Sequence, residues 1–205
     1  RTRGVERMAG KYPENIRREM SHSFHGLNRN KIGLAMDLKD PKHKDGLIDL
    51  VAQSDLIIEN FTSGTLDRLG LGYKNLSDAN KAIVLLSLSG FGASSRLSQM
   101  RAYGLVLSAL SGMEAGILDS QDGEFIGSPT FVASDPNAAT YGLFAAISAI
   151  LAAKKTGFGS HVEISQLEAV AHVAEVKDTE LKKFAETLGL QTAFDQGNQD
   201  IIPCL

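Results

Sequence analysis

The sequence predicts an α/β protein with a doubly wound, mainly parallel, Rossmann-like sheet. Strand-like and helix-like segments alternate along the chain, which is the pattern of that fold class. Two short runs at residues 55–59 and 82–88 are rich in Ile, Val and Leu. Continuous hydrophobicity of this kind is typical of parallel strands that are buried on both faces. Each run is followed by a loop segment, Asn60 with Phe61 and then residues 90–92, where such folds bind ligands.

The remaining elements follow from periodicity and from capping residues. Residues 31–38 alternate toward apolar and predict a strand, and Asp40 with Pro41 opens a helix that runs to about Gln53. That helix is expected to bury Leu47, Leu50 and Val51. The other predicted elements are a short helix at 64–69, helices at 103–115 and 137–155, a strand at 161–165 and a helix from 166 to about 188.

Asp135 stands at the start of the clearest predicted helix, residues 137–155. It is a natural N-cap, Pro136 suits the first helical position, and Gly157 is expected to end the helix. The positive end of a helix stabilises a charged carboxylate, and a carboxylate nucleophile must be charged. The residues therefore leave two roles open for Asp135, a helix cap and a reactive carboxylate.

Composition excludes several classes of function. The chain has 205 residues and a formal net charge of −3, which argues against a nucleic-acid partner. Its single cysteine, Cys204, fits a reducing compartment, and we expect a cytoplasmic protein without a membrane span or signal peptide. Because zinc-protease, paired-cysteine, P-loop and serine-hydrolase motifs are missing from the sequence, we expect no metal.

Several ordered motifs resemble the amino-terminal part of class III CoA-transferases. This family contains the formyl-CoA and carnitine CoA-transferases and the α-methylacyl-CoA racemases. The matching segments are NRNK at 28–31, MDLK at 36–39, DLIIENF at 55–61, GTLDRLGLGY at 64–73, SLSGFG at 87–92, ALSG at 109–112, TGFG at 156–159 and VEIS at 162–165. The spacing from Asp135 to residues 156–157 also resembles that of the family.

The resemblance implies roles for particular residues and a chemistry. Asp135 corresponds to the aspartate that becomes acylated, while CoA moves between an acyl-CoA and a carboxylic acid. The residues implied at the CoA site are Asn60, Phe61, Arg68, Leu69 and Arg101. Tyr103 is implied in the substrate pocket near the thioester. Coenzyme A enters as co-substrate and a homodimer is implied.

The same resemblance implies that the chain is a fragment. Residues 1–188 correspond to part of a large Rossmann-like domain that carries the catalytic aspartate, and residues 189–205 correspond to a linker that leads into a small domain. Two alternatives stay open. One is an α-methylacyl-CoA racemase, although the racemases have a histidine where Tyr103 stands. The other is a non-catalytic acyl-CoA-binding homologue.

Overall fold

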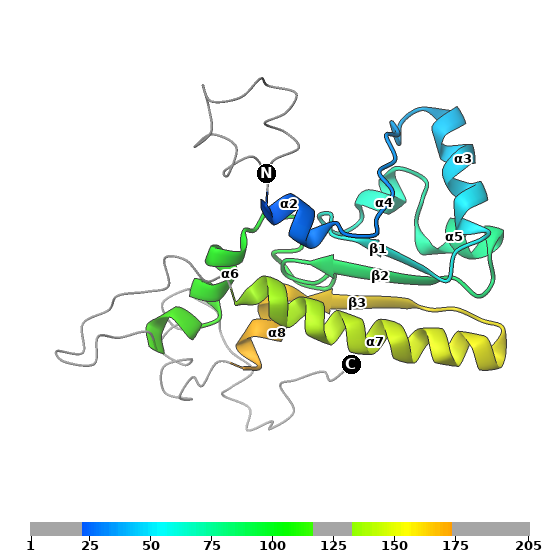
Figure 1. Cartoon of the computed structure of the whole chain (residues 1–205). Coiled ribbons are helices and arrows are strands. Elements are labelled where there is room, and N and C mark those ends of the chain that lie inside the picture. The colour runs from blue at the N-terminus through cyan, green and yellow to red at the C-terminus, as the bar shows by residue number, and fades with distance from the viewer. Residues whose placement is uncertain (1–21, 117–132, 174–205) are drawn as a thin grey trace, which may run out of the picture. The chain divides into compact units, whose positions relative to one another are not determined.

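Three parallel strands form the sheet, in the order β1-β2-β3 (Figure 1). They are β1 (Leu56–Glu59), β2 (Val84–Ser89) and β3 (His161–Ser165). The structure is a computed structural model, and it describes residues 22–116 and 133–173. All three strands were predicted, the first two from their apolar runs, and their parallel pairing confirms the predicted fold class.

Helices cover both faces of this sheet, as a doubly wound fold requires. On one face, α7 (Ser134–Thr156) and α8 (Gln166–Ala171) pack on β2 and β3. On the other face, α3 (Pro41–Val51) and α5 (Tyr73–Ala79) share a buried cluster with β2. Successive residues of a strand point to opposite faces. For that reason Leu86 joins the α7 cluster, whereas Leu85 joins the α3 and α5 cluster.

The chain divides into two compact units, residues 1–37 and 38–205. The described part of the first unit contains α2 (His22–Leu27) and an irregular segment. The strand predicted at residues 31–38 is wrong, because residues 31–37 have no regular structure. Ile32 is 97% exposed. An extended segment becomes a strand only when a neighbour accepts its hydrogen bonds, and none of the described residues pairs with this one.

Local signals place α3 correctly but misassign one of its side chains. The Asp40 side chain accepts a hydrogen bond from the Lys42 backbone N–H at 2.8 Å and so caps the helix. Val51 is buried as predicted, whereas Leu47 is only half-buried and Leu50 is 45% exposed. Ile48 instead packs on the core beside Val51, because it faces the sheet one turn earlier along the helix.

The first turn of α7 differs from the prediction. The helix begins at Ser134 with Ala133 as the N-cap, so Asp135 lies inside the first turn and does not cap the helix. The predicted end is confirmed, since Gly157 takes the left-handed conformation at φ 79°. A glycine also brings α7 close to the sheet. A Cβ on Gly142 would lie 3.0 Å from Leu88 Cδ2.

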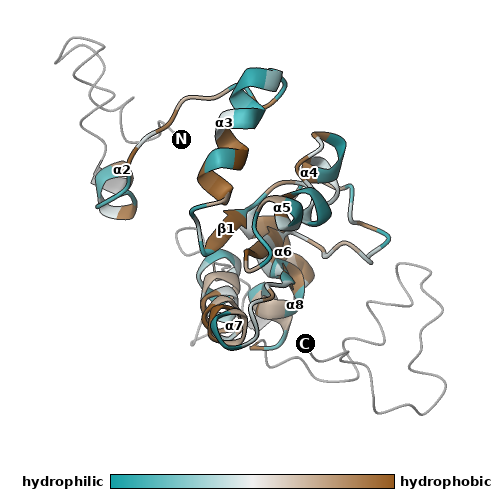
Figure 2. Cartoon of the chain, turned by 90° about the vertical axis from the view of Figure 1, so that its right-hand side faces the viewer, coloured by the Kyte–Doolittle hydropathy of each residue, from teal (hydrophilic) through white to brown (hydrophobic). Residues whose placement is uncertain are grey.

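Helix α7 keeps an apolar surface that the described residues do not cover. Leu143, Phe144, Ile147 and Leu151 are exposed along it, and Figure 2 shows the hydrophobic residues on this helix. Among the described residues, α7 is the one helix that is long and apolar enough to cross a membrane, whereas no membrane span was expected from the sequence. The core helix of a water-soluble protein can have the same length and composition, so these two properties are weak support for a span.

The remaining elements are short. A four-residue helix, α4 (Thr65–Arg68), follows β1 as predicted. The helix predicted at residues 103–115 is divided into α6 (Gly104–Leu110) and a 3₁₀ turn, η2 (Met113–Gly116). Between them Gly112 has φ 82°, a conformation that ends an α-helix. The helix predicted from residue 166 to about 188 ends at Ala171, where α8 stops with His172 as its C-cap. Residues beyond 173, including the predicted linker at 189–205, lie outside the described residues.

Candidate functional site

A polar row crosses the sheet near the carboxyl ends of the strands. Glu59 pairs with Ser87, and Ser87 pairs with Glu163. All three side chains therefore lie on one face, the face that α3 and α5 cover farther back along the strands. The opposite face of β2 presents Val84, Leu86 and Leu88 to α7 and α8. Among the described residues, the polar side chains of the strands thus gather on one face of the sheet at this end.

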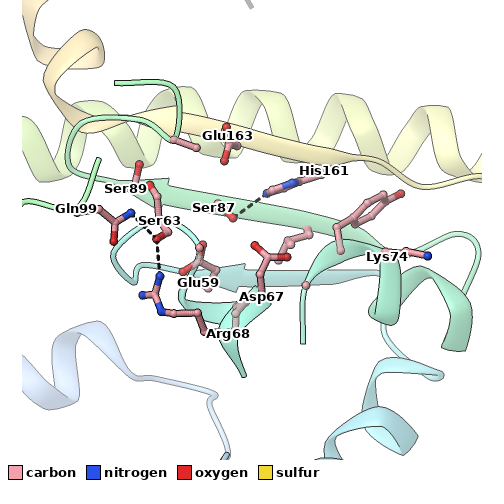
Figure 3. Close-up of a pocket in the computed structure, with 16 residues that line it drawn as sticks. Glu59, Ser63, Asp67, Arg68, Lys74, Ser87, Ser89, Gln99, His161 and Glu163 are labelled. Atoms are coloured by element: carbon pink, nitrogen blue, oxygen red, sulfur yellow. Dashed lines mark hydrogen bonds between the residues drawn. The ribbon is translucent and has the colours of Figure 1, made fainter. Parts of the chain in front are cut away.

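These polar residues line a cavity of about 370 Å³ (Figure 3). Glu59, Asp67 and Glu163 supply carboxylates, while Arg68 and Lys74 supply positive charges. His161, Ser63, Ser87, Ser89 and Gln99 are among the other polar residues at its wall. Because carboxylates and cations are mixed, the cavity as a whole does not favour a multiply charged anion.

His161 and Ser87 are joined within this cavity. The distance from Ser87 Oγ to His161 Nε2 is 2.9 Å, and Figure 3 shows the bond along the cavity wall. The imidazole also stacks on Tyr73, with ring centroids 5.8 Å apart and an interplanar angle of 23°. Ser87 and Tyr73 thus contact the His161 imidazole from two sides.

Arg68 is the one predicted site residue that lines this cavity, as far as the described residues form it. It lies in the last turn of α4. Its guanidinium donates to Thr65 Oγ1 at 2.8 Å and to the Ser63 carbonyl at 3.5 Å. Gln99 also donates to that carbonyl, at 3.2 Å. These contacts orient the guanidinium at the cavity wall while leaving its side chain exposed to solvent.

Three other predicted residues follow β1 but do not line the cavity. Asn60 Nδ2 donates to the Leu88 carbonyl at 2.8 Å, which ties the ends of β1 and β2 together. Phe61 is exposed, and its backbone N–H donates to Glu59 Oε2 at 2.7 Å. Leu69 is the C-cap residue of α4. The structure therefore places Asn60, Phe61 and Arg68 around the end of one strand.

The predicted catalytic group lies in a second place, at the start of α7. Asp135 is exposed, and its Oδ1 lies 3.4 Å from the Ser134 hydroxyl. The same hydroxyl donates to the Gly104 carbonyl, at 3.0 Å. Tyr103 precedes Gly104 and is the N-cap residue of α6, with its side chain 64% exposed. Arg101, two residues earlier, is also exposed.

The start of α7 lies at the end of the sheet where β2 and β3 terminate (Figure 1). Helix α7 runs back along the sheet and joins β3 through residues 157–160, so the start of α7 and the polar row share the carboxyl ends of the strands. Within residues 22–116 and 133–173, no group of His, Cys, Asp or Glu is arranged to hold a metal ion.

Sequence reasoning missed most of the cavity, and one of its signals was visible. Within β2, Ser87 and Ser89 alternate with the apolar Leu86 and Leu88, which marks one face at the end of a buried strand as polar. His161 is exposed, and it contacts Ser87 on the neighbouring strand. Pairing across 74 positions in the sequence has no local signal. Ser134, buried at the start of α7, was also missed.

These features define an α/β protein that gathers polar side chains at the carboxyl ends of parallel strands and presents a carboxylate at the start of a helix. The chain belongs to CoA-transferase family III, whose family model matches residues 2–200. Similarity to individual proteins is consistent with this family and covers about three quarters of the chain.

Two similar proteins are an acetyl-CoA:oxalate CoA-transferase from Acetobacter aceti and a succinyl-CoA:glutarate CoA-transferase from Homo sapiens. The first is 31% identical over 73% of this chain and the second is 30% identical over 72%. This chain spans only 38% and 34% of their respective lengths. A solved CAIB/BAIF family protein from Brucella suis has the same fold, with a TM-score of 0.68 and 24% identity over 80% of this chain and 42% of that one.

Proposed function

We propose that this chain carries the catalytic carboxylate of a CoA-transferase, with Asp135 as a covalent nucleophile. Membership of family III carries this proposal, and the exposure of Asp135 in the first turn of α7 supports it. The N–H groups of a helix's first turn stabilise a negative charge. Asp135 is thus available to solvent and to a substrate in its nucleophilic form.

The reaction proceeds through two anhydrides and one enzyme thioester. The Asp135 carboxylate attacks the thioester carbonyl of an acyl-CoA, and CoA leaves as a thiolate while an acyl-aspartyl anhydride forms. The thiolate then attacks the aspartyl carbonyl, which releases the first acid and leaves an aspartyl-CoA thioester. The acceptor carboxylate displaces CoA to form a second anhydride. Attack of CoA on its acyl carbonyl yields the new acyl-CoA and regenerates Asp135.

Coenzyme A is proposed to bind along the end of β1 and the start of α4. Arg68 offers an exposed guanidinium there, and guanidinium groups bind phosphate well. Glu59, Asp67 and Glu163 repel phosphate from the interior of the cavity. We therefore place the phosphates on the solvent side of Arg68. Asn60, Phe61, Leu69 and Arg101 complete the proposed CoA site, and Tyr103 contacts the acyl end.

Trapping with hydroxylamine tests the covalent step in the full-length natural protein that contains this sequence. The protein is incubated with acetyl-, formyl- or succinyl-CoA, treated with hydroxylamine and analysed by peptide mass spectrometry. We expect a hydroxamate at Asp135, dependent on the acyl-CoA and absent from Asp135→Asn. Glu168→Gln is the matched control, because Glu168 is also a first-turn acid, in α8, and this variant should keep the hydroxamate.

An unmodified Asp135 across this panel would contradict the transferase proposal. Exchange of deuterium into the carbon next to the thioester would then favour the racemase alternative, which needs proton transfer and no acyl-enzyme. Binding of acyl-CoA without either reaction would favour a non-catalytic homologue. The homodimer, the cytoplasmic location and the division at residues 188–189 stay predictions, and light scattering of the purified protein tests the first of them.

A further inference from the structure

Ser134 is a fully buried hydroxyl at the start of α7, with 0% of its surface exposed. Its Oγ donates a hydrogen bond of 3.0 Å to the carbonyl of Gly104, the first residue of α6. This bond joins two helix starts that are 30 residues apart in the sequence. The two bonded residues are sequence neighbours of two proposed site residues. Gly104 follows Tyr103, the N-cap of α6, and Ser134 precedes Asp135 in α7.

The same Oγ lies 3.4 Å from Asp135 Oδ1. A serine hydroxyl has one proton to donate, and O–H···O bonds are usually about 2.5–3.0 Å long. The Gly104 carbonyl is therefore the main acceptor, and the carboxylate is the weaker one. Because Asp135 is not held by a short bond from Ser134, the hydroxyl mainly fixes the backbone that carries the carboxylate.

We infer that Ser134 is a positioning residue for the Asp135 carboxylate, fixing the first turn of α7 against the start of α6. The inference rests on the proposed function of Asp135. The bond between Ser134 and Gly104 holds the proposed nucleophile and Tyr103, the residue proposed to contact the acyl end, in one relative geometry. Displacing a reacting group by about 1 Å can lower a rate by about 100-fold, so one buried bond at this place has a kinetic effect.

Ser108 provides a matched control within the same pair of helices. It is also fully buried, in α6, but its Oγ has no hydrogen-bond partner among the described residues. Replacing an unpaired buried hydroxyl with a hydrogen atom is close to neutral or stabilising. Ser108→Ala and Ser134→Ala therefore remove the same atom from equally buried sites, and only Ser134→Ala removes a hydrogen bond.

The test measures single-turnover acylation of Asp135 in the full-length natural protein, with acetyl-, formyl- or succinyl-CoA as donor and hydroxamate as the readout. We expect Ser134→Ala to lower the acylation rate constant about ten-fold or more. The acyl-CoA concentration that gives the half-maximal rate should stay within about two-fold, because Ser134 is buried and does not touch the substrate. Ser108→Ala should match the wild-type protein in both the acylation rate constant and the acyl-CoA concentration that gives the half-maximal rate.

An acylation rate constant in Ser134→Ala equal to that of the wild-type protein would overturn the inference. So would a decrease in the rate that is no larger than the fraction of this variant that its thermal melt shows to be unfolded. If Ser134→Ala does not fold, Ser134→Cys replaces it, since a thiol is a weaker donor of similar shape. A reduced rate per folded molecule is expected for that variant, and an unchanged rate overturns the inference. If the wild-type protein forms no hydroxamate at Asp135, the proposed function itself is contradicted. That outcome differs from a wild-type rate in Ser134→Ala, which contradicts only the inference about Ser134.

Discussion

Ser87 on β2 and His161 on β3 form a hydrogen bond of 2.9 Å between Oγ and Nε2. The two residues are not direct partners in the strand register, because His161 pairs with Leu85 and Ser87 pairs with Glu163. The bond therefore runs diagonally across the two strands. It lies on the cavity face of the sheet, and it connects a buried hydroxyl with an exposed imidazole.

We predict that His161→Ala lowers the free energy of unfolding by about 1 kcal/mol, because it leaves the Ser87 hydroxyl without its partner. Urea denaturation measures this change. Ser87→Ala and the double variant complete a cycle, in which we expect a coupling of about 0.5–1.5 kcal/mol. Strictly additive effects would show that the bond contributes nothing to stability.

Gly159 is a position where any side chain meets backbone. A Cβ there would overlap the Ile83 carbonyl, and the Gly159 N–H already donates to the Lys81 carbonyl at 2.8 Å. We predict that Gly159→Ala lowers the free energy of unfolding by about 2 kcal/mol or more, because rigid backbone atoms must move.

Gly157→Asn is the matched control for Gly159→Ala. Gly157 has a positive φ, but a Cβ there meets nothing within 4 Å, and asparagine tolerates the left-handed conformation. In urea denaturation, Gly157→Asn should lower the free energy of unfolding by less than about 1 kcal/mol. Equal losses for the two variants would contradict the contact with Ile83 as the reason that residue 159 is glycine.

Asp40 caps α3 through its bond to the Lys42 N–H. We predict that Asp40→Ala lowers the free energy of unfolding by about 1 kcal/mol, the usual effect of losing an N-cap side chain. Asp45 lies inside the same helix and is exposed, so Asp45→Ala should change stability by less than about 0.5 kcal/mol. A thermal melt of both variants checks the difference. Equal losses would contradict a capping role.

Arg68 is predicted to bind the phosphates of CoA. Arg68→Ala should weaken CoA binding about ten-fold in calorimetry, and Arg68→Lys should have a smaller effect, because lysine keeps the charge but not the planar pair of donors. Arg96→Ala is the control, since Arg96 is exposed and does not line the cavity. Raising the salt concentration should reduce the difference between the Arg68 and Arg96 variants. Unchanged affinity in Arg68→Ala would contradict the assignment.

Local sequence patterns predicted the three strands and the long helices α3 and α7, with capping residues marking where the two helices begin and end. They missed α5, in which Leu76 is the only buried residue. A single apolar position has no periodicity to detect. They also predicted a strand at residues 31–38, where apolar alternation is present in the sequence but no described strand pairs with it. Local pattern specifies what a segment prefers, whereas a strand exists only with a partner.

The candidate site likewise has one part that local sequence signals predict and another that depends on contacts between distant residues. The sequence by itself determined Asp135 at a helix start and Arg68 near the end of β1, because capping and helix-stop signals act within a few residues. Only the tertiary structure decided that Ser134 bonds to Gly104 and that His161 bonds to Ser87. These contacts join positions 30 and 74 residues apart. They depend on how helices and strands pack together, and no local pattern of residues encodes that arrangement.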